Sequence, residues 1–118
     1  MNKFIKSDLY RYAGNVSLKS FFYCYRKEAG FRFSVAFRLI NSRVAKLLGI
    51  ILWIFRNKQL IQIARTTQIG YGLYISHGGP VVINPSTIIG NNCNLSQFVT
   101  IGSNEGKAAI IGDDVYIG

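Results

Sequence analysis

The sequence predicts an α+β protein, in which an N-terminal helical segment precedes a parallel β-helix of about three coils. One observation is a six-residue repeat in the second half, where a branched apolar residue is followed each time by a small or turn-forming residue. The other is a three- and four-residue apolar spacing in the first half, which indicates helices. We therefore place a basic helical domain at 1–61 and the hexapeptide repeat at 62–118. The repeated pairs are Ile69-Gly70, Ile75-Ser76, Ile83-Asn84, Ile89-Gly90, Leu95-Ser96, Ile101-Gly102, Ile111-Gly112 and Ile117-Gly118.

Three helical stretches are predicted before the repeat. Met1–Gly14 mixes charged and apolar residues and ends at a glycine, which is typical of a short helix. Ser17–Lys27 begins at an N-cap serine, and we expect its helix to stop near Gly30. From Phe33 to Ile51 an apolar stripe recurs at helical spacing, with a break expected near Asn41-Ser42. Because a domain this small cannot bury such a stripe alone, we expect it to pack on the repeat or on a neighbouring subunit.

The positive charge belongs to the first half of the chain. All but one of the 14 lysines and arginines precede Ile69, and only Lys107 lies within the later repeats. Arg32, Arg38 and Arg43 fall mostly off the apolar stripe, so a solvated helix face is the simplest interpretation. A basic surface can also meet phosphates, a membrane surface or nucleic acid. No nucleic-acid-binding motif is present, and we expect no nucleic-acid partner, whereas peripheral membrane contact stays open.

Two cysteines, Cys24 and Cys93, give neither a disulfide framework nor a metal motif, so we expect no metal. Cys93 occupies a small inward position of the repeat, where cysteine acts as a small apolar residue. The start of the chain, Met1–Arg11, has no apolar run of the kind a signal peptide needs. Lys46–Phe55 is apolar but shorter than the roughly 20 residues of a spanning helix. We expect a cytoplasmic protein without a transmembrane segment.

The repeat has the alternation of extended backbone. A second inward candidate precedes most of the repeated apolar residues by two positions, which puts both side chains on one face of a strand. Turn residues such as Asn91-Asn92 and Asp113-Asp114 separate these pairs. Three sixes per coil then give a triangular prism of parallel strands. The second inward candidates are Thr67, Leu73, Val81, Thr87, Cys93, Val99, Ala109 and Val115.

Two departures from the six-residue period predict loops. Ile75 and Ile83 are eight residues apart, so two extra residues enter at Gly78–Pro80, directly after His77. Ile101 and Ile111 are ten apart, so four extra residues enter around 103–107. Insertions in a solenoid emerge as loops on one face, which is often the binding face. The alternative for each loop is an irregularity of the repeat that has no functional role.

His77 is the candidate catalytic residue. It is the one histidine of the chain, and it follows the inward Ile75 by two positions, so it should face outward beside the inserted loop. An acceptor hydroxyl is a poor nucleophile until a base removes its proton, and imidazole does this well near neutral pH. The alternative is a surface histidine without a functional role.

Ile69–Ile83 and the repeat that follows resemble left-handed β-helix acyltransferases. The resemblance is closest to bacterial serine O-acetyltransferases and to their relatives in surface-polysaccharide gene clusters. Gly30–Phe33 and Phe37–Leu39 are similar to the helical segment of those enzymes, and the likeness extends from about Asp8 to the end. It implies a left-handed coil, a homotrimer, acetyl-CoA as acetyl donor and active sites between subunits.

The same resemblance assigns His77 as general base, with backbone N–H groups of the glycine-rich corners stabilising the oxyanion. Several family residues differ here. Ser76 stands where the family has an aspartate, and Gln62 stands, fifteen residues before His77, where another aspartate orients the imidazole. No acid follows Asp8–Arg11 to contact a serine amine. Glu105 is the candidate replacement for a second histidine in the long loop.

The resemblance implies an acetyl-CoA-dependent O-acetyltransferase. Its acceptor is either a sugar hydroxyl of a surface-polysaccharide precursor or L-serine, which would place it in polysaccharide or cysteine biosynthesis. The missing acids favour a neutral sugar, because an ammonium group needs carboxylates. The repeat stops at Gly118, so we expect a truncated chain with most of its coenzyme A site beyond that residue. The alternative is a non-catalytic trimeric scaffold.

Overall fold

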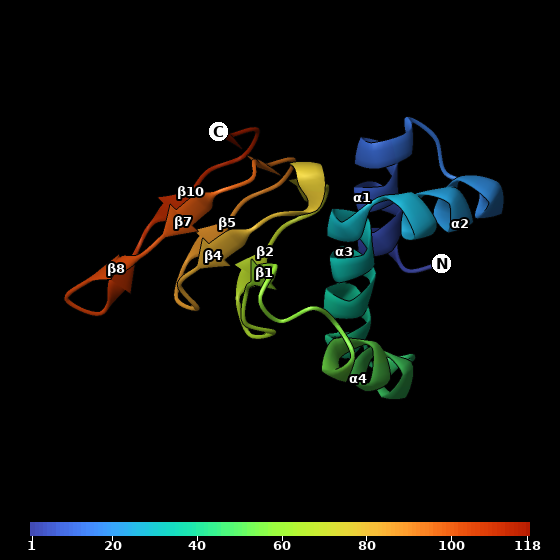
Figure 1. The fold of residues 1–118 in the computed structure, drawn as a ribbon, viewed down its shortest axis with the longest axis horizontal. Coiled ribbons are helices and arrows are strands. Elements are labelled where there is room, and N and C mark those ends of the chain that lie inside the picture. The colour runs from blue at the N-terminus through green and yellow to red at the C-terminus, as the bar shows by residue number, and fades with distance from the viewer.

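The computed structural model describes residues 1–118, with helices gathered at one end of the molecule and short strands stacked at the other (Figure 1). The predicted fold class, an N-terminal helical segment followed by a left-handed parallel β-helix of three coils, is confirmed. The helices are α1 (Lys3–Ala13), α2 (Leu18–Lys27), α3 (Ala29–Ile40) and α4 (Lys46–Ile54). The strands are β1 (Ile61–Gln62), β2 (Gln68–Ile69), β3 (Tyr74–Ile75), β4 (Val81–Ile83), β5 (Ile88–Ile89), β6 (Asn94–Leu95), β7 (Val99–Ile101), β8 (Ser103–Asn104), β9 (Lys107–Ala108), β10 (Ile110–Ile111) and β11 (Tyr116–Ile117), with a 3-10 turn, η1 (Ser76–Gly78), after β3.

Local capping sets both ends of α1 and the start of α2. The Asn2 side chain accepts hydrogen bonds from Phe4 N and Ile5 N at the start of α1, and Gly14 ends this helix with a left-handed φ of 74°. Ser17 caps α2 through Ser20 N, as predicted. The predicted break in the apolar stripe is confirmed, because α3 ends at Ile40 and α4 begins at Lys46.

Each face of the prism is a three-stranded parallel sheet. The strand orders are β1-β4-β7, β2-β5-β10 and β3-β6-β11. Ile61 pairs with Val81 and Val81 with Val99, so the first coil advances by 20 residues and the second by 18. Ile88 pairs with Ile110 on another face, where the second step includes the second insertion and is 22 residues. The excess over 18 equals the two and four residues that the sequence inserts.

Both insertions leave the prism as loops. The first is the corner at His77–Pro80, and the second is an antiparallel β8–β9 hairpin that projects away from the helices (Figure 1). The turns on another edge stack from coil to coil. Asn91 Oδ1 accepts from Tyr71 N (2.8 Å), and Asp113 Oδ1 accepts from Asn91 N (2.7 Å), which keeps the three coils in register.

One apolar core joins the two halves. Phe33 and Phe37 of α3 belong to the same buried cluster as the inward residues of the β-helix, and Trp53 of α4 packs against it. This confirms that the helices pack on the repeat, and the division at 61/62 stays a prediction. In the last coil Ala109 is exposed and Val115 half-buried, since this coil is the open end of the stack. No helix combines the length and the apolar character needed to cross a bilayer.

The helices also cap the opposite edge of the β-helix. Backbone groups of the first coil that point away from the second coil would otherwise lie unpaired at a sheet edge. Side chains of α1 and α3, and Asn41 at the end of α3, bond them instead. The bonds run from Arg38 to Ile69 O and Gly70 O, from Gly72 N to Ser7 Oγ, from Arg11 to Gly72 O, from Leu73 N to Asp8 Oδ1, between Tyr12 OH and both Ile75 N and Ile75 O, and from Asn41 to Arg65 O.

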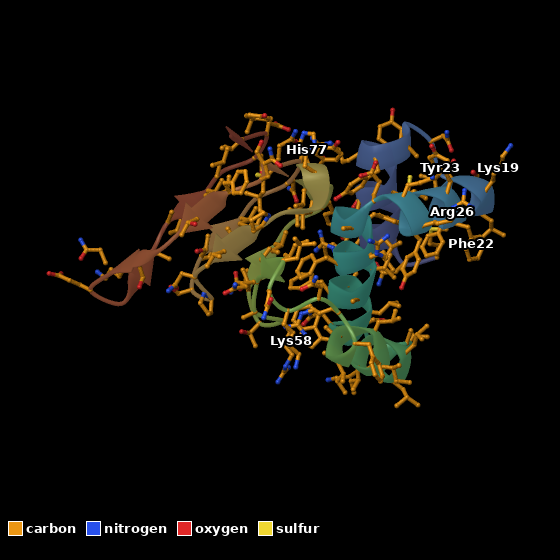
Figure 2. The ribbon with its side chains drawn as sticks, viewed as in Figure 1. Lys19, Phe22, Tyr23, Arg26, Lys58 and His77 are labelled. Carbon is orange, nitrogen blue, oxygen red and sulfur yellow. The ribbon has the colours of Figure 1, made fainter.

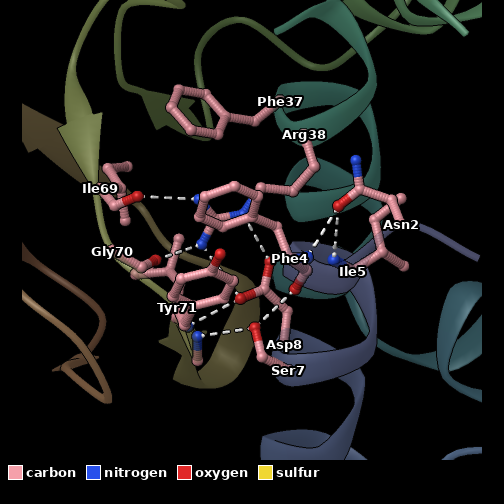
Figure 3. A network of polar contacts seen from close by, with 12 residues as sticks. Asn2, Phe4, Ile5, Ser7, Asp8, Phe37, Arg38, Ile69, Gly70 and Tyr71 are labelled. Carbon is pink, nitrogen blue, oxygen red and sulfur yellow. Dashed lines mark hydrogen bonds and ion pairs between the residues drawn. The ribbon is translucent and has the colours of Figure 1, made fainter. Parts of the chain in front are cut away.

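A buried ion pair lies at the centre of this cap (Figure 3). Arg38 Nε and Nη2 donate to the two carboxylate oxygens of Asp8 at 2.8 and 3.1 Å. Burial raises the pKa of Asp8, because desolvation outweighs the Arg38 guanidinium and the Leu73 N–H. Such a pair adds little net stability, but it fixes geometry. Here it connects α1 and α3 to the first coil, with Phe4 stacked on Tyr71 at 4.2 Å between ring centroids.

One sequence-based expectation is wrong. Arg38 is not solvated but 4% exposed, since its guanidinium donates to the edge carbonyls and to Asp8. Helix α2 stops near Gly30 as expected, at Lys27, and Gly30 itself lies inside α3. Its small size matters there, because a Cβ would come within 2.4 Å of Ile75 O and 2.5 Å of the Tyr12 hydroxyl.

Candidate functional site

The His77 corner has an unusual backbone. His77, Gly78 and Gly79 have φ values of 58°, 70° and 96°, so three residues in succession adopt left-handed or related conformations. Glycine accepts such φ values freely, whereas for histidine they are uncommon and cost free energy. A strained residue persists only where its surroundings hold it. Two neighbouring segments of the same chain, at Ala29 and at Leu60, provide this constraint.

The corner is held between the start of α3 and the start of the β-helix. Gly78 is buried against Ala29, and a Cβ at Gly78 would lie 2.8 Å from Ala29 Cβ. A Cβ at Gly79 would lie 2.5 Å from Leu60 O. The two glycines inserted after His77 therefore allow a close approach that any other residue would prevent. This contact fixes the direction in which the His77 side chain leaves the backbone.

The His77 side chain points outward at the junction of the helical part and the β-helix (Figure 2). It is exposed, and it makes no hydrogen bond within the chain. No carboxylate lies within ion-pair distance, since Asp8–Arg38 is the one ion pair of the chain. Ser76 is half-buried beside it. Both imidazole nitrogens are thus free to bind an external group.

Helix α1 holds β3, the strand that leads into this corner. Tyr12 OH accepts from Ile75 N at 3.0 Å and donates to Ile75 O at 3.3 Å, two residues before His77. Burial raises the pKa of Tyr12, because desolvation outweighs the hydrogen bond to Ile75, so the hydroxyl stays protonated and can donate. Arg11 donates to Gly72 O (2.8 Å) and to Asn94 Oδ1, and its guanidinium lies 5.8 Å from the centre of the Tyr74 ring.

The second coil extends the same corner. Phe98 N donates to Pro80 O at 2.6 Å, so Phe98 lies directly beside the inserted loop. Phe98 also has a positive φ of 66° and is 75% exposed, which gives the corner an aromatic surface. Ser96 is buried and donates to Tyr116 OH at 3.0 Å.

The other two candidate residues lie elsewhere in the same chain. Gln62 is exposed on β1 and donates to Gln59 O at 3.4 Å, within a groove that His77 does not line. Glu105 is exposed at the tip of the β8–β9 hairpin, at the far end of the molecule from the helices (Figure 1). One copy of the chain therefore brings Ser76 and His77 together but neither Gln62 nor Glu105. No group of three or more His, Cys, Asp or Glu side chains is placed to hold a metal ion.

Sequence reasoning missed the residues that position the corner. Arg11, Tyr12 and Phe98 lie 66, 65 and 21 positions from His77 in the chain, and no local pattern links them to it. One signal was available for the backbone, since a Gly-Gly-Pro insertion directly after a histidine indicates a constrained turn. Long-range partners of that turn become visible only in three dimensions.

The arrangement is suited to proton removal from an external hydroxyl. It offers an unpaired imidazole at a fixed exit direction, beside an aromatic surface and without an acidic partner. It does not offer a free carboxylate for an ammonium group.

No protein-family model and no curated protein matches the chain. A solved structure does: the serine acetyltransferase of Neisseria gonorrhoeae, determined in complex with serine, has a TM-score of 0.71 and 26% sequence identity. The match covers 98% of this chain and 51% of that chain, so this chain spans about half the length of the enzyme that it resembles.

Proposed function

We propose that the chain is an acetyl-CoA-dependent O-acetyltransferase in which His77 is the general base. The observation that carries the proposal is the His77 corner, because a strained and tightly held turn presents an imidazole that has no bonding partner in the chain. Strain of this kind is concentrated at functional sites. The similarity to a serine acetyltransferase over 98% of the chain supports the same reaction class.

The reaction follows from the chemistry of a hydroxyl and a thioester. The His77 imidazole takes the proton of the acceptor hydroxyl, and the oxygen attacks the carbonyl carbon of acetyl-CoA. Backbone N–H groups near the corner stabilise the oxyanion. The C–S bond then breaks, the acetyl ester forms, and the imidazolium returns its proton to the thiolate of coenzyme A.

We further propose a neutral acceptor, a sugar hydroxyl of a polysaccharide precursor, rather than L-serine. The helical half contains two acids, and Asp8 is fully engaged by Arg38 and Leu73. Glu28 ends α2 and lines a groove with Tyr12, Ser17 and Lys19 that His77 does not line. Within one copy, a serine ammonium group at His77 would therefore have no carboxylate placed in the same groove, and burying it without one is costly.

The site is completed between copies of the chain in this proposal. The hairpin that carries Glu105 projects away from its own His77, so a neighbouring subunit of a trimer is what would bring the two together. Coenzyme A release from acetyl-CoA, followed with a thiol reagent, tests the proposal over a panel of nucleotide-sugars and L-serine. Both cysteines are buried, which keeps the background of the folded protein low. We expect coenzyme A release to depend on a sugar acceptor. Release with L-serine but with none of the nucleotide-sugars would reject the proposed sugar acceptor. No release with any acceptor would reject the proposed acetyltransferase activity.

A non-catalytic scaffold is the second candidate. It is favoured by the absence of an ion pair between His77 and any carboxylate of its own chain. Titration calorimetry with acetyl-CoA separates the two functions. A stable trimer in light scattering that shows no heat of acetyl-CoA binding would support the scaffold, whereas a measurable affinity supports the enzyme.

A further inference from the structure

The outer face of α4 is apolar and uncovered. Its inner face packs on α3, with Gly49 so close that a Cβ would lie 2.2 Å from Ile40 N, and with Trp53 against Phe33 and Phe37. The opposite face contains no polar side chain. Its residues, with the preceding Val44, have exposed fractions between 37% and 98%. This apolar surface consists of Val44, Leu47, Leu48, Ile50, Ile51, Ile54 and Phe55.

Exposure on this scale marks an interaction site, because soluble monomers rarely leave a contiguous apolar patch uncovered. Single exposed leucines need no explanation, but here a whole helix face is apolar. The helix is nine residues long and cannot span a bilayer. Its apolar outer face and its one-sided packing are those of a helix that lies in a membrane interface.

The charges around α4 indicate what covers it. Arg43 and Lys46 lie at its start and Lys58 just after its end, and all three are exposed. Figure 2 shows Lys58 beside α4, at the end of the molecule remote from α2. No Asp or Glu occurs between Glu28 and Glu105, so nothing in this region neutralises these cations.

We propose that the α4 surface, defined as the apolar residues above with Arg43, Lys46 and Lys58, docks onto an anionic lipid membrane. The apolar side chains enter the boundary between headgroups and acyl chains, and the three cations meet lipid phosphates. A second copy of the chain is a poorer occupant in a two-fold contact. Both partners would then present the same unneutralised cations and no acid to each other.

Flotation of the full chain with lipid vesicles tests this proposal. Vesicles of phosphatidylcholine with about one quarter phosphatidylglycerol are compared with pure phosphatidylcholine. Three cations near an anionic surface predict about 100-fold tighter binding to the anionic vesicles, falling steeply as salt is raised. The comparison uses the wild-type protein with both kinds of vesicle, so misfolding of a variant cannot explain a difference in binding.

Two pairs of variants locate the surface. Lys46→Gln with Lys58→Gln should weaken binding to anionic vesicles about 25-fold, whereas Lys19→Gln with Lys27→Gln removes equal charge from α2 and should change it far less. Leu48→Ser with Ile54→Ser should weaken binding by about ten-fold or more. Val82→Ser with Ile110→Ser on the β-helix is the matched control, and circular dichroism verifies folding.

Three results would overturn the proposal. One is equal flotation with neutral and anionic vesicles, or none with either. Another is an equal effect of the α2 and α4 charge variants. The third is an oligomer, seen in light scattering, that Leu48→Ser with Ile54→Ser dissociates without changing flotation, which would assign the surface to a second copy.

Discussion

Replacing Tyr12 by phenylalanine tests how the helical half holds the His77 corner. The substitution removes one oxygen and keeps the ring, which packs against Phe31 and Tyr74 with centroid distances of 5.5 and 4.6 Å. It leaves Ile75 N and Ile75 O, now bonded by Tyr12 at 3.0 and 3.3 Å, without these partners. Ile75 is fully buried, so water cannot readily replace the hydroxyl.

The expected loss follows from these two groups. A buried backbone group left unsatisfied costs about 1–3 kcal/mol, and the longer of the two bonds is weak, so we expect Tyr12→Phe to lower the free energy of unfolding by about 2 kcal/mol. Urea unfolding followed by the fluorescence of Trp53, the one tryptophan, measures this at equal protein concentration.

Tyr10→Phe is the matched control. Tyr10 lies on the same helix, is 58% exposed and makes no side-chain hydrogen bond, so the same change should cost less than about 0.5 kcal/mol. If the two variants unfold at the same urea concentration, Tyr12 does not hold the corner and the edge-capping role assigned to α1 is wrong.

The remaining predictions concern pH, packing and the hairpin. Because the pKa of Tyr12 is raised above its ordinary value of 10.0, its stabilising effect is complete well below that pH and decreases progressively as the pH rises through and above it. The difference in unfolding free energy between wild type and Tyr12→Phe should therefore shrink between about pH 8 and about pH 11, and a constant difference would refute the assignment. Gly49→Ala should cost about 1–3 kcal/mol, since its Cβ would press on the backbone at Ile40, whereas Gly102→Ala meets nothing within 4 Å and should cost less than about 0.5 kcal/mol. Deleting 104–107 restores the six-residue period, and circular dichroism with urea unfolding should show an intact fold within about 1 kcal/mol of wild type; loss of the cooperative transition would show that the hairpin is structural.

The periodic parts of the fold were predictable from sequence. Six-residue spacing gave the three coils, because each inward residue must reach one shared core, and the departures from that spacing gave both loops at the right places. Local capping signals at Ser17 and Gly14 gave helix ends for the same reason: they depend on neighbours in the chain.

The cap on the first coil was not predictable. Arg38 looks like a surface residue by helical spacing, and Asp8 like one more charge in a short helix. Their burial depends on edge carbonyls and amides some 31 and 65 residues away along the chain. The packing role of Gly30 was not predictable for a related reason, since its close approach to Ile75 involves a residue 45 positions away in the chain.

The candidate site also has one part that was predictable from sequence and one part that was not. The outward position of His77 follows from its spacing to the buried Ile75, and the structure shows it exposed. Roles for Ser76, Gln62 and Glu105 stay predictions. Neither Gln62 nor Glu105 touches His77 within one chain, and contacts between copies leave no mark in a single sequence.

Coenzyme A release by wild type and His77→Asn, measured with the acceptor found in the panel, tests the central claim most directly. Asparagine is the right replacement, because it tolerates the positive φ of this corner and removes only the base. We expect kcat/KM to fall by about 100-fold or more with an unchanged unfolding midpoint in urea, since a general base contributes about 10²–10⁴-fold. Equal turnover by His77→Asn and wild type would contradict the assignment of His77 as the base.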